Sequence, residues 1–539
     1  MESRNMGLAE RAFRRIGLIV VPLILISPVT LAQVPKAPSD AVLHSIKHIV
    51  VIYQENWSFD SLYGLFPGAN GLAQSSSASL NQTDRFDQPL SAQVGPTFSL
   101  VSGTLALATP PQPINNSVKP AIIDTRFTPG LNTLVPYDVL KNSTLLANDI
   151  TGDIVHRFWH EQSQIDHGAM DWFVTWSDNP GLTMSYFDAT NMPEGLLAQK
   201  YTMADNFFHA AFGGSFLNHQ FLIAAAAPVY PNPPAALQAT LDADGQLLVD
   251  PVSGKIVHDG PITPVGGVSF SAAPTTFGKT YAVNTIFSAN LVPVFSAAGS
   301  ASLLPTLNDT NPSDAVRPYT PTIGDRLNAA KVSWKWYSGG WDNALLSTAS
   351  NPANNGSPLP NGPVDPLFQW HHQPFAYYDN FAPWKNGVRN SVSAAHLQDE
   401  ARFFQDLRAE RLPAVSFIKP LGPNNEHPGY AGLLQGQQHV ADIVSAVQGS
   451  DYWEDTLIIV TYDEHGGRWD HVTPPTANGI WGDGTRVPAI FIGPHAKRGY
   501  VDHTQYDTLS ILKTIEERFG LAPLTALDAH AASLKGSLR

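Results

Sequence analysis

The sequence predicts an α/β fold in which a central sheet is flanked by helices. Apolar runs rich in β-branched residues, typical of buried strands, occur at residues 46–53, 332–337, 414–418, 456–462 and 487–492. Helical patterns occur at residues 154–176, 218–227, 433–447 and 506–519. Strands that alternate with helices along a chain favour a layered α/β arrangement.

The composition provides for a large core. The chain has 539 residues, of which 43% are hydrophobic and 10% aromatic, and this excludes a wholly disordered protein. Two regions interrupt the alternation: residues 72–150 are rich in Ser, Thr, Gln, Asn and Pro, and residues 228–322 carry many Pro and Gly. We interpret both as insertions in one domain that spans residues 33–539.

The N-terminal residues 1–32 have the pattern of a signal peptide. Arginines precede a short apolar stretch broken by Pro22, and a small-residue cleavage site leaves Gln33 as the first mature residue. We therefore expect a periplasmic or secreted protein with no stable membrane span after cleavage. An uncleaved anchor is the alternative, and the Arg14–Arg15 pair leaves the Sec and twin-arginine routes both open.

Charge and cysteine content restrict the chemistry. The formal net charge is −14 and the mature region has no basic run, so a nucleic-acid partner is disfavoured. The absence of cysteine excludes disulfides and thiolate metal sites. An anionic substrate would need a local positive site, most simply a metal held by His, Asp, Glu, Asn or a hydroxyl group.

Two of the expected strands end in candidate metal ligands. Glu55 and Asn56 follow the first strand, and Asp463 and Glu464 follow the strand at 456–462. If these strands are parallel neighbours, all four side chains meet at one edge of the sheet. Neighbouring carboxylates repel unless a cation lies between them, which a divalent metal of undetermined identity would supply. The alternative is a charged surface turn.

Ser215 follows two glycines and begins a helical segment. Glycines let the backbone turn sharply, and free N–H groups at a helix N-terminus favour an anion such as phosphate. A hydroxyl group there can attack phosphorus if a metal lowers its pKa. An ordinary serine N-cap is the alternative.

Several histidines are candidate proton donors. His156 and His160 are spaced i, i+4 within the expected helix at 154–176, His371 and His372 are adjacent, and His427 follows the strand at 414–418. Histidine can donate to a phosphoryl oxygen or protonate a leaving alkoxide. Each of them can instead be structural or simply exposed.

Three stretches resemble a known family. "IVVIYQENWSFDSLYG" and "TYDEHGGRWDHVTPP" resemble the bacterial phosphoesterase family, which contains phospholipases C and respiratory-burst-inhibiting acid phosphatases. "DNFFHAAFGGSFLNHQFLI" is similar to the acid-phosphatase branch, where serine is the nucleophile, whereas the phospholipase C branch typically has threonine. The resemblance spans residues 46–520, in order.

The resemblance implies an alkaline-phosphatase-like α/β fold that holds a divalent metal ion, with variable insertions at about 72–150 and 228–365. The metal ligands it implies are Glu55, Asn56, Asp463, Glu464 and Ser215. The phosphate-contacting residues it implies are His156, His371, His372 and His427.

The first hypothesis is a secreted, metal-dependent acid phosphatase that hydrolyses small phosphomonoesters through a phosphoserine at Ser215. A histidine, His427 or one of His371 and His372, would protonate the leaving group, so the pH optimum would be acidic. The alternative is a phospholipase C acting on a phosphodiester headgroup, for which aromatic residues near His371 would form an apolar mouth: Trp370, Phe375, Tyr377 and Tyr378. A third reading is a metal- or anion-binding protein without turnover.

Overall fold

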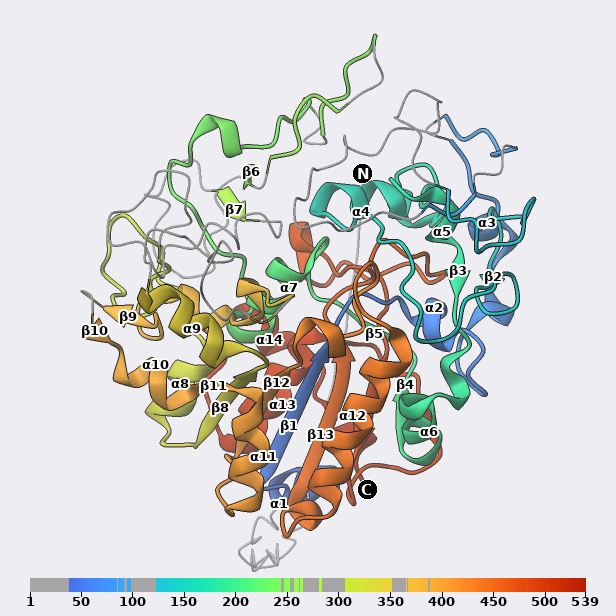
Figure 1. Cartoon of the computed structure of the whole chain (residues 1–539). Helices are drawn as coiled ribbons and strands as arrows, with labels where there is room; N and C mark the ends of the chain where they lie inside the picture. The colour runs from blue at the N-terminus through green and yellow to red at the C-terminus, as the bar shows by residue number, and fades with distance from the viewer. Residues whose placement is uncertain are drawn as a thin grey trace, which may run out of the picture. The chain divides into compact units, whose positions relative to one another are not determined.

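Figure 1 shows a large sheet at the centre of the computed structural model, with its strands running toward a layer of loops. The structure describes residues 38–539 except for the following: 85, 92–94, 98–122, 244–246, 253–255, 261, 265–280, 284–305, 351–364, 366 and 386–387. The predicted signal peptide therefore lies outside the described residues, as do parts of both predicted insertions.

The sheet has eight strands, and one of them runs against its neighbours. Their order is β11 (Leu397–Asp399), β8 (Trp334–Ser338), β12 (Val415–Lys419), β1 (His48–Gln54), β13 (Thr456–Tyr462), β14 (Ala489–Ile492), β4 (Thr202–Ala204) and β15 (Tyr500–Asp502). β14 is antiparallel to β13 and β4, and the remaining pairs are parallel. The sheet is therefore mixed, with β1 and β13 as parallel neighbours at its centre.

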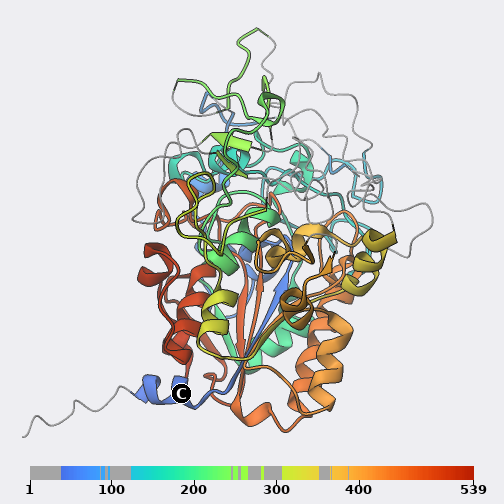
Figure 2. The ribbon, with the colours of Figure 1, turned by 90° about the vertical axis from the view of Figure 1, so that its left-hand side faces the viewer.

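Helices cover both faces of the sheet. Figures 1 and 2 show α11 (Glu400–Arg408) and α12 (Leu433–Gln448) on one face, and α13 (Thr508–Phe519) and α14 (Ala526–His530) on the other. α6 (Pro193–Lys200) packs against α12, and α7 (Ser215–Ala224) packs against α13. The other helices are α1 (Pro38–Ser45), α2 (Phe59–Tyr63), α3 (Ser77–Leu80), α4 (Phe158–Ile165), α5 (Pro180–Thr183), α8 (Ile323–Ala329), α9 (Trp341–Ser350) and α10 (Ser391–His396).

Short two-residue and three-residue strands pair outside the main sheet. They are β2 (Tyr137–Asp138), β3 (Ser185–Tyr186), β5 (Phe207–Phe208), β6 (Ile262–Pro264), β7 (Tyr281–Val283), β9 (Trp384–Lys385), β10 (Val388–Arg389) and β16 (Tyr506–Asp507). β16 pairs with β5 in parallel, next to the start of α13.

The central strands form the core because both of their faces are covered. From Ile49 to Tyr53 no residue of β1 is more than 1% exposed, and all of β13 is buried. Strands covered on both faces have continuous apolar sequences, and both β1 and β13 show this pattern. Each fully buried Val or Ile contributes about 1.5–3 kcal/mol relative to an exposed one.

The α/β prediction is confirmed, and most predicted elements lie within a few residues of the observed ones. The long helix predicted at 154–176 is wrong, because α4 ends at Ile165 and is followed by a 3₁₀ turn, Asp166–Gly168. Asp166 and His167 adopt left-handed conformations, with φ of 41° and 51°, and these end the helix. His156 lies before the first turn, so the predicted i, i+4 pairing with His160 on one helix face is also wrong.

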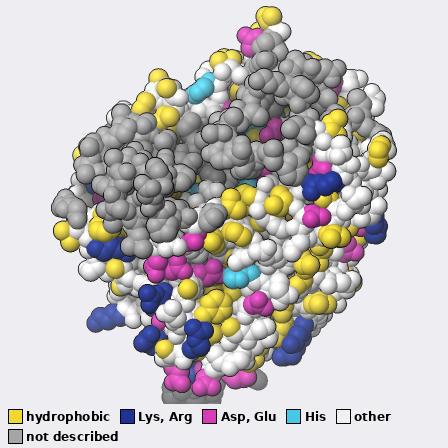
Figure 3. All heavy atoms as spheres, viewed as in Figure 1, with side chains coloured by type: hydrophobic (Ala, Val, Ile, Leu, Met, Phe, Trp, Pro, Cys, Tyr) yellow, Lys and Arg dark blue, Asp and Glu magenta, His cyan; other side chains and the backbone are white. Residues whose placement is uncertain are grey.

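The surface carries both signs of charge. On the face shown in Figure 3, Lys and Arg side chains are interspersed with Asp and Glu. Within the part of the chain that the structure describes, no helix has the length and apolar character that crossing a bilayer requires.

A buried arginine ties together the segments around the carboxyl ends of the central strands. Arg486, just before β14, is 0% exposed and forms ion pairs with Asp60 of α2, at 3.1 Å, and with Asp470 of the loop after β13, at 2.8 Å. It also donates to the carbonyl groups of Asn70 and Asp205, both at 2.7 Å. The arginine thus fixes this corner of the fold.

Replacing Arg486 by Met is expected to lower the free energy of unfolding by about 3–5 kcal/mol, because two buried carboxylates lose their cation. Urea unfolding followed by circular dichroism measures the change. Lys47→Met is the matched control, since Lys47 pairs with Asp455 at 2.7 Å but is 66% exposed, and an exposed pair contributes about 1 kcal/mol or less. Equal effects of the two substitutions would contradict this account.

Candidate active site

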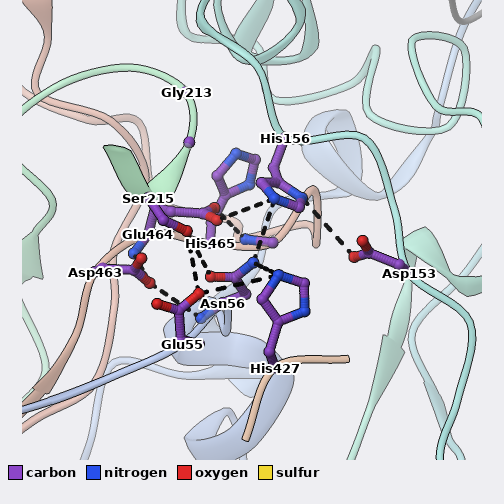
Figure 4. A network of polar contacts seen from close by, with 12 residues as sticks. Glu55, Asn56, Asp153, His156, Gly213, Ser215, His427, Asp463, Glu464 and His465 are labelled. Atoms are coloured by element: carbon purple, nitrogen blue, oxygen red, sulfur yellow. Dashed lines mark hydrogen bonds and ion pairs between the residues drawn. The ribbon is translucent and has the colours of Figure 1, made fainter. Parts of the chain in front are cut away.

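Ser215 lies between the ends of the two central strands. Its Oγ is 3.1 Å from Oε2 of Glu55 and 3.4 Å from Oδ1 of Asn56, as Figure 4 shows. The backbone N–H of Asn56 donates to Oδ1 of Asp463 at 3.2 Å, which joins the end of β1 to the end of β13. The structure therefore brings together Ser215 and the residues predicted to follow both strands.

The backbone around Ser215 has room only for glycine at two positions. Gly213 has a φ of +92°, and a Cβ there would lie 2.4 Å from the backbone nitrogen of Phe158. Gly466 has a φ of +62°, and a Cβ there would lie 2.4 Å from the carbonyl oxygen of Asn56. Both glycines allow loops distant in sequence to pack closely against each other. Ser215 then begins α7, whose free N–H groups favour an anion.

The carboxylates at the end of β13 are buried beside a third carboxylate. Burial and the neighbouring carboxylate of Glu55 raise the pKa of Asp463, and burial and Asp463 raise the pKa of Glu464. Asp463 Oδ2 and Glu464 Oε1 have no hydrogen-bond partner although both are buried. Buried carboxylates in this state need a cation or a proton.

This donor set fits a divalent metal ion. It offers carboxylate oxygens from Glu55, Asp463 and Glu464, the amide oxygen of Asn56 and the hydroxyl of Ser215, all ligands suited to a hard or borderline cation. Each of the three carboxylates has one oxygen without a hydrogen-bond partner, although that of Glu55 has ion-pair partners. That these residues hold the ion stays a prediction of the family resemblance, and their oxygen-dominated character leaves the identity of the ion open.

Lys419, the last residue of β12, supplies a fixed positive charge to this site. It is 0% exposed and forms an ion pair with Oε1 of Glu55, on the opposite carboxylate oxygen from Ser215. Burial alone would raise the pKa of Glu55, but Lys419 and His372 outweigh it and hold that pKa well below its usual value. These neighbours therefore favour the ionised form of Glu55.

Two of the predicted histidines face the same amide. The Nδ2 group of Asn56 lies 2.8 Å from Nε2 of His427 and 3.3 Å from Nε2 of His156. Each ring places its Nδ1 on a backbone carbonyl, at 2.6 Å from Ile154 for His156 and 2.5 Å from Pro428 for His427. These contacts fix both rings with Nε2 toward the site.

His371 and His372 lie in a second group, on another side of Glu55. His372 Nε2 is 2.8 Å from Oε1 of Glu55, so this ring is on the Lys419 side of the carboxylate. His371 is buried with no hydrogen-bond partner on either ring nitrogen, and packs edge-on against His372 and His219. His160 points elsewhere, with Nδ1 3.6 Å from Asp259.

Three further residues belong to the site although sequence analysis did not single them out. Lys419 contacts Glu55, and Nδ1 of His219 lies 3.8 Å from Oδ2 of Asp463. Glu161 of α4 accepts the N–H of Gly213 at 2.6 Å and that of Thr485 at 2.8 Å. A lysine as the last residue of an apolar strand was the one signal that the sequence offered for Lys419.

The sequence pattern of the phosphoesterase family matches residues 46–522 of this chain. The chain belongs to the phosphoesterase family. It is 24% identical over 532 residues to phospholipase C B of Mycobacterium tuberculosis, a similarity that covers 93% of this chain and 78% of that protein. It is 30% identical over 237 residues to phospholipase C A of the same organism, covering 40% of this chain and 41% of that protein.

Among solved structures, this phosphoesterase is similar to a protein in the alkaline phosphatase superfamily from Vibrio parahaemolyticus. The identity is 10%, the similarity covers 62% of each chain, and the TM-score is 0.28. The family prediction is thus confirmed by the match over residues 46–522, and the enzyme is a hydrolase of phosphoric ester bonds. The acid-phosphatase branch stays a prediction.

Divalent cations are expected to raise the melting temperature of the chelator-treated phosphoesterase, because an ion that binds the folded state stabilises it by mass action. Differential scanning fluorimetry with Mg²⁺, Mn²⁺, Ca²⁺ and Zn²⁺ in turn measures the shift. Asp463→Asn should abolish most of it. Asp309→Asn, which alters a buried carboxyl group outside the site, should leave it intact, and a shift unaffected by Asp463→Asn would rule out this site.

Proposed function

We propose that this phosphoesterase hydrolyses phosphomonoesters by transferring the phosphoryl group to Ser215 and then to water. The observation that carries the proposal is the position of the Ser215 hydroxyl, which begins α7 and contacts Glu55 and Asn56. A serine that served only as a helix cap would accept a hydrogen bond from its own helix, whereas the N-cap residue here is Gly214. The Ser215 hydroxyl therefore faces the candidate metal site.

In the first step the Ser215 oxygen attacks phosphorus in line with the leaving oxygen, and the bond between phosphorus and that oxygen breaks. The hydroxyl proton of Ser215 passes to Oε2 of Glu55, which accepts it at 3.1 Å. A bound divalent ion would supply positive charge that lowers the pKa of the hydroxyl and offsets charge on the phosphoryl oxygens. The N-terminal N–H groups of α7 face the same anion. Glu161 and the two glycines before Ser215 hold the hydroxyl in position.

A histidine donates a proton to the leaving oxygen. We propose His427, because its Nε2 is directed at the site and lies within hydrogen-bonding distance of Asn56. Burial lowers the pKa of His427 and of His156, so either ring, when protonated, is a better proton donor than an exposed histidine. The expected pH optimum is acidic, because the donor is protonated only at low pH. Water then attacks the phosphoserine and releases phosphate.

Phospholipase C activity is the second candidate, and the names of the relatives favour it. The aromatic mouth expected from the sequence does not support it. Trp370, Phe375, Tyr377 and Tyr378 are at most 6% exposed and lie in the core, where Phe375 packs against Trp334 at 4.7 Å. We propose further that residues 1–32 direct export, and that residues 33–539 form one catalytic domain with the insertions described above.

Ser215→Ala is expected to lower kcat by about a thousandfold or more, because it removes the nucleophile. The assay compares p-nitrophenyl phosphate with p-nitrophenyl phosphorylcholine from pH 4 to 9, with and without chelator. Ser163→Ala is the matched control, since the Ser163 hydroxyl bonds only to its own helix at Trp159. Acid-optimal, chelator-sensitive cleavage of the monoester supports the proposal.

Dominant cleavage of phosphorylcholine would instead favour phospholipase C. Binding of metal without turnover of either substrate would favour the non-catalytic reading. Rapid acid quenching with a ³²P-labelled monoester tests the intermediate directly, since label should be retained on the wild-type chain and be absent from Ser215→Ala.

His427→Asn is expected to slow hydrolysis of an alkyl phosphate by about 10²–10⁴-fold, and to slow that of p-nitrophenyl phosphate much less. Alkoxide is a poor leaving group that needs a proton, whereas p-nitrophenolate leaves without one. Steady-state kcat for both substrates gives the ratio, and His156→Asn is the comparison. A larger leaving-group dependence in His156→Asn would transfer the role of the acid to that residue.

A further inference from the structure

Three site residues are each preceded by a residue of one hydrogen-bonded cluster, which is centred on the carboxyl group of Glu426. Gln54 precedes Glu55, Tyr462 precedes Asp463, and Glu426 precedes His427. The Gln54 amide donates to Oε1 of Glu426 at 2.8 Å, and the Tyr462 hydroxyl donates to Oε2 of Glu426 at 2.7 Å. The Glu426 side chain therefore joins three segments that carry the site.

The arrangement follows from the alternation of side chains along a strand. Gln54 and Tyr462 are partners in the register of β1 and β13, and both reach the face covered by α6 and α12. The next residues, Glu55 and Asp463, face α7 on the opposite side. One face of this strand pair thus carries the chemistry, and the other carries the contacts that align the two strand ends.

A second carboxyl group completes the cluster. Glu194 of α6 is 0% exposed, and its Oε2 lies 3.0 Å from the same Tyr462 hydroxyl oxygen that lies 2.7 Å from Oε2 of Glu426. Its Oε1 has no hydrogen-bond partner. Because the hydroxyl has a single hydrogen, it can hydrogen-bond to both carboxyl groups only if one of them holds a proton and donates it. Gly436 of α12 packs directly against the Glu426 side chain, since a Cβ there would lie 2.1 Å from Cγ of Glu426.

We infer that the Glu194–Glu426 pair is a positioning group for the active site, and that the proton it holds keeps the ends of β1 and β13 and the His427 segment aligned. The inference deepens the proposed function, because it rests on the role proposed for His427. When the last proton leaves, two adjacent buried carboxylates repel each other. Glu426 is then displaced, and it carries His427 with it.

The groups that face the pair cannot compensate for a second negative charge. They are Gln54 from β1, Tyr63 from α2, Gln437 from α12 and Tyr462 from β13. Both amides are neutral. Burial and nearby carboxylates raise the pKa of Tyr63 and of Tyr462 well above their usual value, so both phenols stay neutral.

The pH dependence that follows has a definite sign. Burial raises the pKa of Glu426 to about 7, and burial with the adjacent Glu426 raises the pKa of Glu194 well above its usual value. A raised pKa stabilises the fold fully below the unfolded value, about 4.3 for glutamate. That stability is lost as the pH rises through the folded-state pKa. The alkaline limb of the activity profile should therefore come from this pair.

The decisive variant is Glu194→Gln. The new amide at position 194 faces Glu426 and always offers it a hydrogen, whereas in the wild type the shared proton has to supply that hydrogen. The experiment measures kcat on p-nitrophenyl phosphate from pH 5 to 10 with saturating divalent metal. We expect kcat below pH 6 to stay within about twofold and the alkaline limb to move up by about one pH unit or more. An alkaline limb that stays in place overturns the inference.

Glu516→Gln is the matched control. Burial and the neighbouring carboxyl group of Asp528 raise the pKa of Glu516 to about 9, but this pair joins only α13 and α14. Its alkaline limb should coincide with that of the wild type, and an equal shift would overturn the inference. If Glu194→Gln does not fold, Glu426→Gln takes its place with the same expected direction, and an unmoved limb is again decisive.

A second readout does not depend on turnover. The urea midpoint of the metal-free wild type should fall as the pH rises from 5 to 9, and it should fall less steeply in Glu194→Gln. Equal slopes overturn the inference. Because this series needs no substrate, it stays informative if Ser215→Ala disproves the proposed nucleophile, so the two failures are distinguishable.

Discussion

The active site depends on burying three carboxylates at the adjoining ends of two parallel strands. Glu55, Asp463 and Glu464 are all 0% exposed, and together they carry more negative charge than the single buried ammonium of Lys419 can offset. Such a cluster is stable only with a further cation or with protons. We propose that a divalent ion offsets this excess of negative charge, and that a phosphate ester would be held through that ion.

Glycines in the surrounding loops allow the backbone to pack closely around that cluster. Gly213 and Gly466 let the Ser215 loop and the loop after β13 approach other backbone segments closely. Glu161 then accepts the Gly213 N–H and approaches His465, the residue after Glu464, at 3.6 Å. Burial alone would raise the pKa of Glu161, but His209 and His465 hold it at about 2. The carboxylate therefore stays ionised above that pH and keeps accepting the N–H groups of both loops.

Residues on the central strands were predictable because their positions follow from local pattern. A continuous apolar run predicts a strand covered on both faces, and the polar residue that ends it lies at the edge of the sheet. This placed Glu55, Asn56, Asp463 and Glu464 correctly relative to one another. Lys419 and Glu161 depend on which strand or loop lies beside them, and a single sequence does not carry that information. The failure at 154–176 has the same origin, since the pattern there was apolar and helical but left-handed residues ended α4 early.

The two faces of the β1–β13 pair balance their buried charge in different ways. Loss of the metal ion and loss of the shared proton would both lower activity, but they can be told apart. On the α7 face, the proposed divalent ion would balance the charge, so removing it should weaken both catalysis and stability. On the α6–α12 face, charge is balanced by a proton on Glu194 and Glu426, which no chelator reaches. If activity is lost at alkaline pH even with saturating metal, the cause is deprotonation of the carboxyl pair. If added metal restores the activity, the cause lies in the metal ligands. On this proposal, the residues just before Glu55, Asp463 and His427 position those three residues, and the Glu194–Glu426 pair sets the pH up to which they stay aligned.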